Sequence, residues 1–555
     1  MSTLDREFLG DMPLTAIASR STIAIDTGTW KYLEPRYEDK LSPCSHACPA
    51  GNDISKVLAL FAAGDPAGAA QLLRAANPLP ATLGRVCPHF CERQCNRDSF
   101  GGAIAVHMLE RYLGELPFTP PPTLGGGRKV AVVGAGPAGI TAAYLLARAD
   151  YEVEVFDDKP KPGGYLRTGI PDYRLPKEVL DREIALVEGV GVKFTPKTRV
   201  GRDISFEDLK SRFDAVIVAV GLHASRRLAI PGIEHPRVYD GVELLEQILL
   251  GKSLDLPRKV AVVGGGNTAV DVARSLLRLG VKPTIVYRRT EAEMPAIASE
   301  VTEAKHEGVA FRLLAAPTAV VTRRNAIVGL ECAKMRLGAP DQSGRRAPEP
   351  IPDSQFRIPV SGVVLAIGET ADMEFLPESL RGAKLGGNLE GIFVAGDAST
   401  NEGTVTAAVG SGRRVAAMVD QYLRSGTKAE GEPSLQSLWP RRVNVQVADL
   451  QQLNSAYFTP EQPPKIQKSN GAIPPTSFKE IVKDFSAESA LCEARRCFGC
   501  GTCNGCLNCY YWCPDIAIHG NSPIDLHIDA DHCKGCGICV EECPRGAMAL
   551  KEAGR

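Results

Sequence analysis

The sequence predicts an α/β fold with two parallel-sheet domains, one nested within the other, and a cysteine-rich segment toward each end of the chain. A strand–glycine–helix–strand pattern over residues 129–157, which returns over residues 259–289, predicts the two sheets. Most of the seventeen cysteines recur at CxxC or CxxxC spacing near the two ends, which predicts metal ligation there.

The first pattern reads KVAVVGAGPAGITAAYLLARADYEVEVFD, as in a dinucleotide-binding βαβ unit. A buried-strand run leads into a glycine turn and a helix of small residues, whose N-terminus offers free N–H groups to a pyrophosphate. The second strand ends on an acid at the spacing that binds a ribose 2′-hydroxyl, and a 2′-phosphate is disfavoured there. We therefore expect FAD at this unit, bound by Gly134, Gly136, Ala138, Gly139 and Asp157.

The second pattern, KVAVVGGGNTAVDVARSLLRLGVKPTIVYRR, ends instead on two arginines. A planar guanidinium group forms two parallel hydrogen bonds to phosphate oxygens. The arginine pair at the end of this unit therefore suits the 2′-phosphate of NADPH. The alternative is that the arginines form a solvated surface pair and that the nucleotide is NADH. The residues expected to bind the nucleotide are Gly264, Gly265, Gly266, Asn267, Thr268, Arg288 and Arg289.

Net charge, apolar runs and cysteine spacing limit the classes of protein to which this chain can belong. The 555 residues carry a net charge of −1, so no basic field favours nucleic acid. We find no signal-peptide pattern at the N-terminus and no apolar run long enough to span a bilayer. Together with cysteine spacing typical of metal ligation rather than disulfides, this predicts a cytoplasmic protein.

Two cysteine runs near the C-terminus, each CxxCxxCxxxCP, have the pattern of two-cluster bacterial ferredoxins, in which the fourth cysteine of each run ligates the other cluster. Zinc is the alternative, but zinc ribbons do not need eight cysteines in this register. One predicted [4Fe–4S] cluster uses Cys503, Cys506, Cys509 and Cys543. The other uses Cys513, Cys533, Cys536 and Cys539.

Five motifs between residues 134 and 416 resemble, in order, those of the glutamate synthase small-subunit family, which includes the NADPH/FAD part of dihydropyrimidine dehydrogenase. They are GAGPAG, PGGYLRTGIPDYRLPK, GGGNTAVDVAR, VYRRTEAEMPA and AGDASTNEGTVTAAVGSGRRVA. The resemblance covers about residues 41–425. It implies FAD contacts at Gly164, Gly396, Asp397, Thr404 and Val405. The helix start at Thr404 would place N–H groups near the flavin ring, where they stabilise reduced flavin.

The resembling family also binds two clusters in an N-terminal helical domain, with help from an upstream CxxC pair. Residues 1–43 contain no cysteine, but EARRCFGCG occurs at residues 493–501. We expect this segment to fold back, so that one cluster takes Cys44, Cys95, Cys497 and Cys500. The other takes Cys48, Cys87, Cys91 and, by the resemblance, Glu110. Alternatively, Cys497 and Cys500 are unligated, or the ligand register shifts within the three-residue repeat from Cys497 to Cys509. If the fold-back fails, three clusters form instead of four.

These features predict an NAD(P)H oxidoreductase subunit in which hydride passes between nicotinamide and flavin, and single electrons pass between flavin and clusters. We name no catalytic side chain, because the hydride step needs none. A thioredoxin-reductase-like enzyme is excluded, since Cys332 is the only cysteine between Cys95 and Cys492. There is no spare length for a glutaminase or substrate barrel.

We expect a partner subunit of the 2-oxoacid:acceptor oxidoreductase type. The alternatives are free ferredoxin, with or without bifurcation, and a glutamate synthase large subunit. The expected architecture is two nested Rossmann-like domains with an α-helical Fe–S domain and an α+β ferredoxin-like domain. Its segments are 1–125 (helical Fe–S), 126–258 and 361–425 (FAD), 259–360 (NAD(P)H), 426–490 (extended linker) and 491–555 (ferredoxin-like). Helices are expected at 54–63, 67–76 and 104–113, and a strand of the FAD domain at 362–368.

Overall fold

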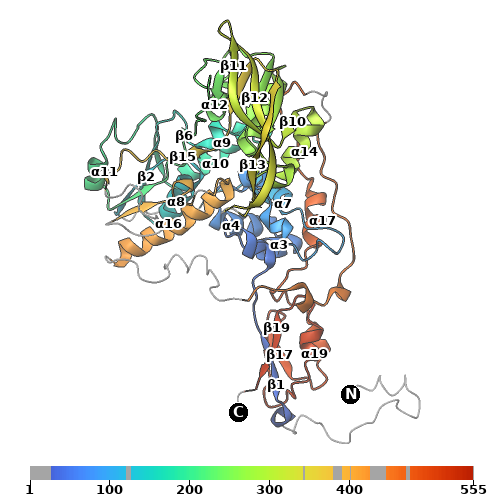
Figure 1. The fold of residues 1–555 in the computed structure, drawn as a ribbon. Helices are drawn as coiled ribbons and strands as arrows, with labels where there is room; N and C mark the ends of the chain where they lie inside the picture. Colours follow the sequence, from blue (N-terminus) through green and yellow to red (C-terminus); the bar gives the residue numbers. More distant parts are fainter. Residues whose placement is uncertain are drawn as a thin grey trace, which may run out of the picture.

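A computed structural model describes residues 27–120, 127–341, 344–378, 391–400, 402–425, 446–469 and 475–553 (Figure 1). Residues 121–126, where the helical Fe–S segment is expected to meet the FAD segment, lie outside these ranges, as do residues 1–26 and parts of the predicted extended linker. The mixed α/β architecture, with a helical cysteine-rich part and a ferredoxin-like part, is confirmed. Among the described helices, none combines the length and apolar character needed to cross a membrane.

The first domain is a five-stranded parallel sheet in the order β16-β5-β2-β3-β4. Strands β16 and β5 are wholly apolar and β2 nearly so, because helices cover both faces of the sheet. The strands are β2 (Lys129–Val133), β3 (Glu152–Phe156), β4 (Lys193–Thr195), β5 (Ala215–Val218) and β16 (Ile392–Val394). The helices are α8 (Pro137–Arg148), α9 (Tyr165–Thr168), α10 (Lys177–Gly189), α11 (Phe206–Arg212), α15 (Asp397–Thr400) and α16 (Val405–Ser425).

The second domain repeats this plan in the order β10-β9-β8-β14-β7, again parallel. It comprises β7 (Val238–Asp240), α12 (Gly241–Leu249), β8 (Lys259–Val263), α13 (Asn267–Arg278), β9 (Lys282–Tyr287), η3 (Glu291–Glu293), α14 (Ala298–Glu307), β10 (Ala310–Leu313) and β14 (Gly362–Leu365). An antiparallel sheet extends from it: β11 (Ala315–Arg323), β12 (Ala326–Pro340) and β13 (Arg346–Ile358). The short antiparallel strands β6 (Ala224–Ser225) and β15 (Glu369–Thr370) pair where the chain enters and leaves this domain.

One strand differs from expectation. The run at 362–368, assigned above to the first domain, forms β14 in the second sheet, between β8 and β7. The chain returns to the first sheet only at β16. Both sheets are parallel and buried, so a short apolar run fits either one equally well.

Toward the N-terminus a helical bundle packs against the first domain. It comprises α2 (Pro43–Ala47), α3 (Ile54–Ala62), α4 (Pro66–Ala76), α5 (Pro80–Val86), α6 (Phe90–Arg93) and α7 (Val106–Glu115). The three predicted helices are therefore present, as α3, α4 and α7. A late helix, α17 (Ala487–Arg495), joins the same core: Ala490 and Ala494 are buried with Ile54, Leu58 and Leu109.

The ferredoxin-like domain projects from the body and contains both ends of the described chain (Figure 1). Strand β1 (Leu33–Tyr37) pairs antiparallel with β19 (Met548–Glu552). The rest of the domain is α18 (Asn508–Tyr511), β17 (Ile518–Ser522), β18 (Asp525–Ile528) and α19 (Ile538–Glu541), with η2 (Thr27–Trp30) beside it. Between α16 and α17 the described chain is extended, apart from η6 (Leu450–Gln452) and η7 (Ser455–Tyr457).

Candidate functional site

The first nucleotide site lies at the turn between β2 and α8. An added Cβ at Gly134 would lie 2.4 Å from the carbonyl oxygen of Ala219, and one at Gly139 would lie 2.0 Å from that of Gly134, so close packing requires both glycines. Gly136, the N-cap of α8, faces open space with no atom within 4 Å of an added Cβ. The turn is therefore packed on the protein side and open where a pyrophosphate would bind.

Asp157, at the end of β3, is held toward this turn. One carboxylate oxygen accepts from the backbone N–H of Ala135 at 2.6 Å, and the other accepts from that of Lys159 at 2.8 Å. Burial raises the pKa of Asp157, against the opposing effect of these two bonds. A carboxylate held in this way can accept a hydrogen bond from a ribose hydroxyl group. The residues present therefore fit the FAD assignment.

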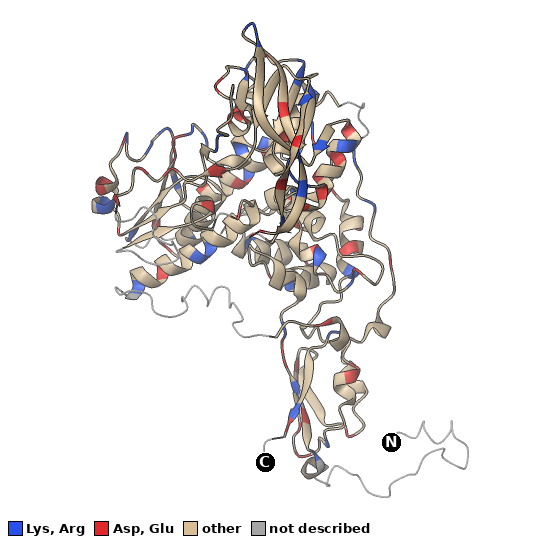
Figure 2. Cartoon of the chain, in the orientation of Figure 1, with Lys and Arg blue, Asp and Glu red and all other residues tan. Residues whose placement is uncertain are grey.

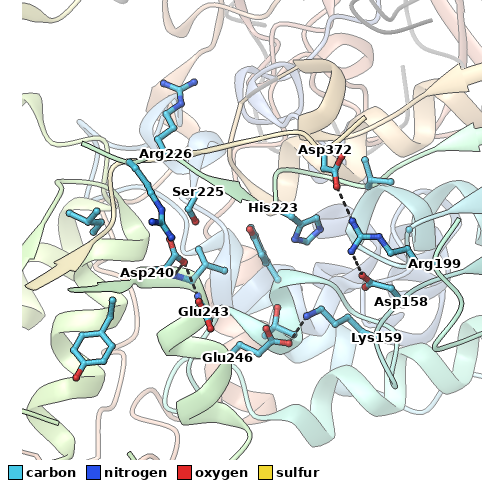
Figure 3. Close-up of a pocket in the computed structure, with 18 of the residues that line it drawn as sticks. Asp158, Lys159, Arg199, His223, Ser225, Arg226, Asp240, Glu243, Glu246 and Asp372 are labelled. Carbon is cyan, nitrogen blue, oxygen red and sulfur yellow. Dashed lines mark hydrogen bonds and ion pairs between the residues drawn. The ribbon is translucent and has the colours of Figure 1, made fainter. Parts of the chain in front are cut away.

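Asp157 lines two adjoining cavities between the parallel-sheet domains, one of about 760 Å³ and one of about 200 Å³. In the larger one, Figure 3 shows the guanidinium of Arg199 between Asp158 and Asp372, and the ammonium of Lys159 directed at Glu246. These charged side chains surround the end of β3, at Asp157.

The smaller cavity is where three parts of the molecule meet. Its lining comes from the first domain (Gly136, Ala138, Gly164, Gly396, Asp397, Thr404 and Val405), from the second (Asn267, Thr268 and Ile297) and from the helical bundle (Val86 and Pro88). Every residue that the resemblance assigned to FAD therefore reaches this one space. Asp397 accepts from the N–H of Gly403 at 2.9 Å, and Thr404 caps α16 by accepting from Ala407 at 3.2 Å. The 21-residue helix α16 begins here.

The second nucleotide site repeats the arrangement of the first. An added Cβ at Gly264 would lie 2.1 Å from the carbonyl oxygen of Ala366, and one at Gly265 would lie 2.5 Å from the ring of Tyr287. Gly266, the N-cap of α13, again faces open space. The side-chain oxygen of Asn267 accepts from the N–H of Ile297 at 2.9 Å and holds the following loop against the turn.

The two arginines after β9 have different environments. Arg288 is exposed at the end of the strand. Arg289 is 3% exposed and donates to the carbonyl oxygen of Arg346 at 2.7 Å and to the carboxylate of Asp341 at 2.5 Å. Its guanidinium is thus engaged in binding the long strands β12 and β13. Arg288 is therefore the better candidate of the two for a 2′-phosphate.

Three cysteines and one acid gather beside the smaller cavity. Burial first, and then the carboxylate of Glu110 and the sulfur of Cys48, raise the pKa of Cys87 to about 12. Burial first, and then Glu92 and the neighbouring sulfur of Cys48, raise the pKa of Cys91 well above its usual range. Glu110 is half-buried, and burial raises its pKa to about 8. It accepts from the amides of Asn52 and Asn77 at 3.0 and 2.9 Å, both on Oε1.

A second group joins the two ends of the chain. Burial first, and then Cys497, Cys500 and Cys95, raise the pKa of Cys44 well above its usual range. Burial and the neighbouring Cys497 and Cys95 raise the pKa of Cys500 to about 12. Cys500 is buried and the other three are partly buried. Thiolates this close together repel one another, so the site favours a bound cation, which deprotonates its thiol ligands and balances their charge. The fold-back of residues 497–500 brings these four together.

The eight cysteines of the two C-terminal runs surround two small cavities in the ferredoxin-like domain. One is lined by Cys503, Cys506, Cys509 and Cys543, and the other by Cys513, Cys533, Cys536 and Cys539. Each run therefore contributes its fourth cysteine to the other cavity, as the spacing predicts. The hydroxyl of Tyr37, on β1, lies 3.2 Å from Cys509 Sγ, a contact that no sequence pattern indicated.

Sequence reasoning also missed the pair that fixes the fold-back. Glu493 and Arg496 have 0% exposed side chains and form an ion pair at 2.7 and 2.8 Å. Arg496 also donates to the carbonyl oxygens of Gly101, Gly102 and Glu461, and Glu493 accepts from the N–H of Ala105. The pair binds α17 to the loop before α7.

Comparisons with known proteins agree with this geometry. A family model described as pyridine nucleotide-disulphide oxidoreductase matches residues 128–412. The chain belongs to this family. Models described as dihydropyrimidine dehydrogenase domain II with a 4Fe–4S cluster, and as a 4Fe–4S binding domain, match residues 38–119 and 526–549. The oxidoreductase thus has iron–sulfur domains on both sides of its nucleotide-binding core.

Three relatives have informative names. The chain is 36% identical to the NADP(+)-dependent formate dehydrogenase subunit beta of Moorella thermoacetica, over 83% of this chain and 70% of that protein. It is 36% identical to the NADPH-Fe(3+) oxidoreductase subunit beta of Geobacter sulfurreducens, over 70% and 65%. It is 34% identical to the glutamate synthase [NADPH] small chain of Escherichia coli, over 68% and 88%. The resemblance and the oxidoreductase class are confirmed.

Proposed function

We propose that this oxidoreductase subunit exchanges electrons between NADP(H) and a partner protein, by way of FAD and four [4Fe–4S] clusters. FAD supplies two-electron exchange with nicotinamide and one-electron exchange with the clusters, whose potentials the protein tunes by burial and hydrogen bonds. The observation that carries the proposal is the position of Cys87. It lies between Val86 and Pro88, which line the same cavity as Gly136, Asp397 and Asn267.

Residues of the chain have separate tasks in this proposal. Gly136 and Asp157 bind the FAD pyrophosphate and ribose, and the start of α16 directs N–H groups to the ring. Gly266 and the N-terminus of α13 bind the NADPH pyrophosphate, and Arg288 selects the 2′-phosphate. The ligands beside the flavin are Cys48, Cys87, Cys91 and Glu110.

Three further cysteine sets extend from there toward the surface. Cys44, Cys95, Cys497 and Cys500 come next, and Cys503 follows Cys500 after only two residues, so adjoining sets are closely linked. The two ferredoxin-like sets complete the row. The proposed function uses all fifteen clustered cysteines and leaves Cys332 and Cys492 without a role.

The partner is a subunit with its own redox centre. We retain the 2-oxoacid:acceptor oxidoreductase type as the first candidate, with free ferredoxin as an alternative. Similarity to a formate dehydrogenase beta subunit favours a formate-oxidising partner as a second candidate. Co-purification from the native host, followed by reduction assays with 2-oxoacids and formate, separates these partners.

Two matched glycine variants test the nucleotide assignments. Gly136→Ala and Gly266→Ala each add a methyl group into space that the protein leaves open, at backbone angles that alanine adopts readily. We expect G136A to fold but to purify without flavin. G266A should retain FAD, which NADPH then reduces slowly. Loss of flavin from both variants, or from neither, would contradict the assignment.

Anaerobic iron and sulfide analysis tests the clusters. Four [4Fe–4S] clusters require about sixteen irons per FAD. Twelve irons would instead support unligated Cys497 and Cys500. Cys497→Ser should remove about four irons, whereas Cys492→Ser, at an exposed neighbouring cysteine, should remove none.

A further inference from the structure

The ferredoxin-like domain exposes aromatic side chains on one short segment. Tyr510, Tyr511 and Trp512 follow one another at α18 and are 42%, 73% and 55% exposed. This helix carries Cys509 of one cluster cavity, and Cys513 of the other follows directly after it. The aromatics therefore lie over the part of the domain that separates the two cysteine sets.

A fourth aromatic extends the surface from a distant part of the sequence. Tyr457, 44% exposed, lies on the extended segment that follows the first domain. Its hydroxyl donates to Glu542 and interacts with Trp512, and the exposed Cys506 lies nearby. We call Tyr457, Tyr511 and Trp512 the aromatic patch. It adjoins a cysteine that our proposed function assigns as a cluster ligand.

Acidic groups border the patch. The side-chain amide of Asn508, at the start of α18, donates to the backbone carbonyl oxygen of Glu542 at 3.3 Å, so the end of α19 lies beside α18. Glu541 and Glu542 are therefore next to the aromatics, and Figure 2 marks an acidic part of the α19 ribbon in red. Exposed aromatics surrounded by charge are typical of a protein-binding surface.

The whole domain shares this negative charge. Residues 503–553 contain seven Asp and Glu but three Lys and Arg, although the chain as a whole carries only −1. All three basic side chains are engaged within the protein: Lys534 with Asp515, Lys551 with Glu38, and Arg545 with the carbonyl oxygen of Phe498. Residues 27–40, which complete the domain, contain three Lys and Arg and three Asp and Glu, so they leave the excess of acids unchanged.

From this geometry and charge we propose that the aromatic patch and its acidic border bind a redox protein with a basic surface around an apolar centre. The apolar centre packs on Tyr511 and Trp512, and the basic groups face Glu541 and Glu542. This surface would bring the partner's redox centre close to Cys506. The inference deepens the proposed function, on which it rests, by naming the chemistry of the partner.

A defined acceptor tests the surface. Cytochrome c is a basic one-electron acceptor, and succinylated cytochrome c is the same protein with its lysines made acidic. Under anaerobic conditions, the loaded holoenzyme is reduced either with NADPH or with dithionite that is then removed, and is mixed with each cytochrome. We expect the native form to be reduced much faster, at a rate that falls as ionic strength rises.

Two double variants probe the patch and its border separately. Tyr511→Ser with Trp512→Ser should lower the second-order rate with native cytochrome c by about tenfold, as for truncated interface anchors. Glu541→Gln with Glu542→Gln should lower it several-fold at low salt and weaken its salt dependence. The matched controls are Leu250→Ser and Glu207→Gln, at exposed positions on the nucleotide domains. Iron content and cluster spectra should be unchanged in all four.

Several outcomes would overturn the inference. The first is an equal rate of electron transfer to both cytochromes, and the second is an equal rate in the patch and control variants. The third is a change in self-association in the patch variants, which would show that a second copy of the chain occupies the surface. If Trp512→Ser disturbs the clusters, the rates of Tyr511→Ser alone and of the glutamate variants still test whether this surface binds the acceptor. Charge and patch effects seen after dithionite but not after NADPH would support the surface and contradict the proposed function.

Discussion

Replacing Arg496 with methionine should detach the C-terminal fold-back from the helical bundle. Arg496→Met preserves most of the side-chain volume but removes the positive charge from a site with 0% exposure. Glu493 would be left as a buried carboxylate without its cation. Three backbone carbonyl oxygens, of Gly101, Gly102 and Glu461, would also lose their donor.

The magnitude follows from these contacts. Removing one partner of a buried ion pair costs about 3–5 kcal/mol, because the other charge is left without compensation. A typical domain is stable by about 5–15 kcal/mol, so this loss is enough to open a segment held mainly by α17. The exposed neighbour Arg495 offers a matched control, Arg495→Met, for which we expect less than about 0.5 kcal/mol.

The assay is iron content together with limited proteolysis. Opening of α17 would withdraw Cys497 and Cys500, so R496M should hold about twelve irons instead of sixteen and be cleaved near residue 490. Glu493→Gln in the R496M background should restore part of the stability, because the uncompensated charge is then gone. If R496M matched R495M in iron content and unfolding temperature, the reasoning would be refuted.

Three further predictions concern the nucleotide domains and their contact with the bundle. Arg288→Gln should raise the KM for NADPH by ten- to a hundredfold and leave that for NADH nearly unchanged, as steady-state flavin reduction would show. Tyr173→Leu should lower the free energy of unfolding by about 2 kcal/mol, because the Arg278 guanidinium carbon lies 3.8 Å from the centroid of the Tyr173 ring. Thermal unfolding measures this loss, and Tyr173→Phe, which keeps the ring, is the control. Burial raises the pKa of Glu183 from 4.5 to about 7, so the folded state binds more protons than the unfolded state between these values and stability falls as pH rises through them. In denaturant titrations Glu183→Gln should reduce this decline by up to about 3 kcal/mol, and an identical pH profile would contradict the prediction.

The parts of the site that the sequence predicted well are those whose constraints are local. Gly134 and Gly139 are required because an added Cβ would lie within 3 Å of backbone atoms. A requirement of this kind can be recognised from a few consecutive residues. The ferredoxin-like register is local in the same sense, since its eight cysteines fall into two runs of eleven residues, four in each. Patterns of this kind need no knowledge of the rest of the chain.

Features that depend on distant partners could not be predicted. Arg289 looked like a phosphate ligand beside Arg288, but its guanidinium is directed at Asp341, which directly follows β12 and lies 52 residues later. The strand at β14 fits either sheet by composition, and only pairing with β8 and β7 assigns it. Arg496 and Gly101 are 395 residues apart, a separation across which sequence spacing carries no information.

The pairing of β1 with β19 has a consequence for how electrons can leave the molecule. Because β1 belongs to the ferredoxin-like domain, two chain segments connect that domain to the body: residues 38–42 and residues 500–503. Lys40, on the first, is buried and donates to the carbonyl oxygen of Gly546 at 2.6 Å. A domain joined by one linker could swing between partners, but one joined twice and packed at the junction is held in place. The row of cysteine sites is therefore better suited to a fixed path than to a shuttling carrier.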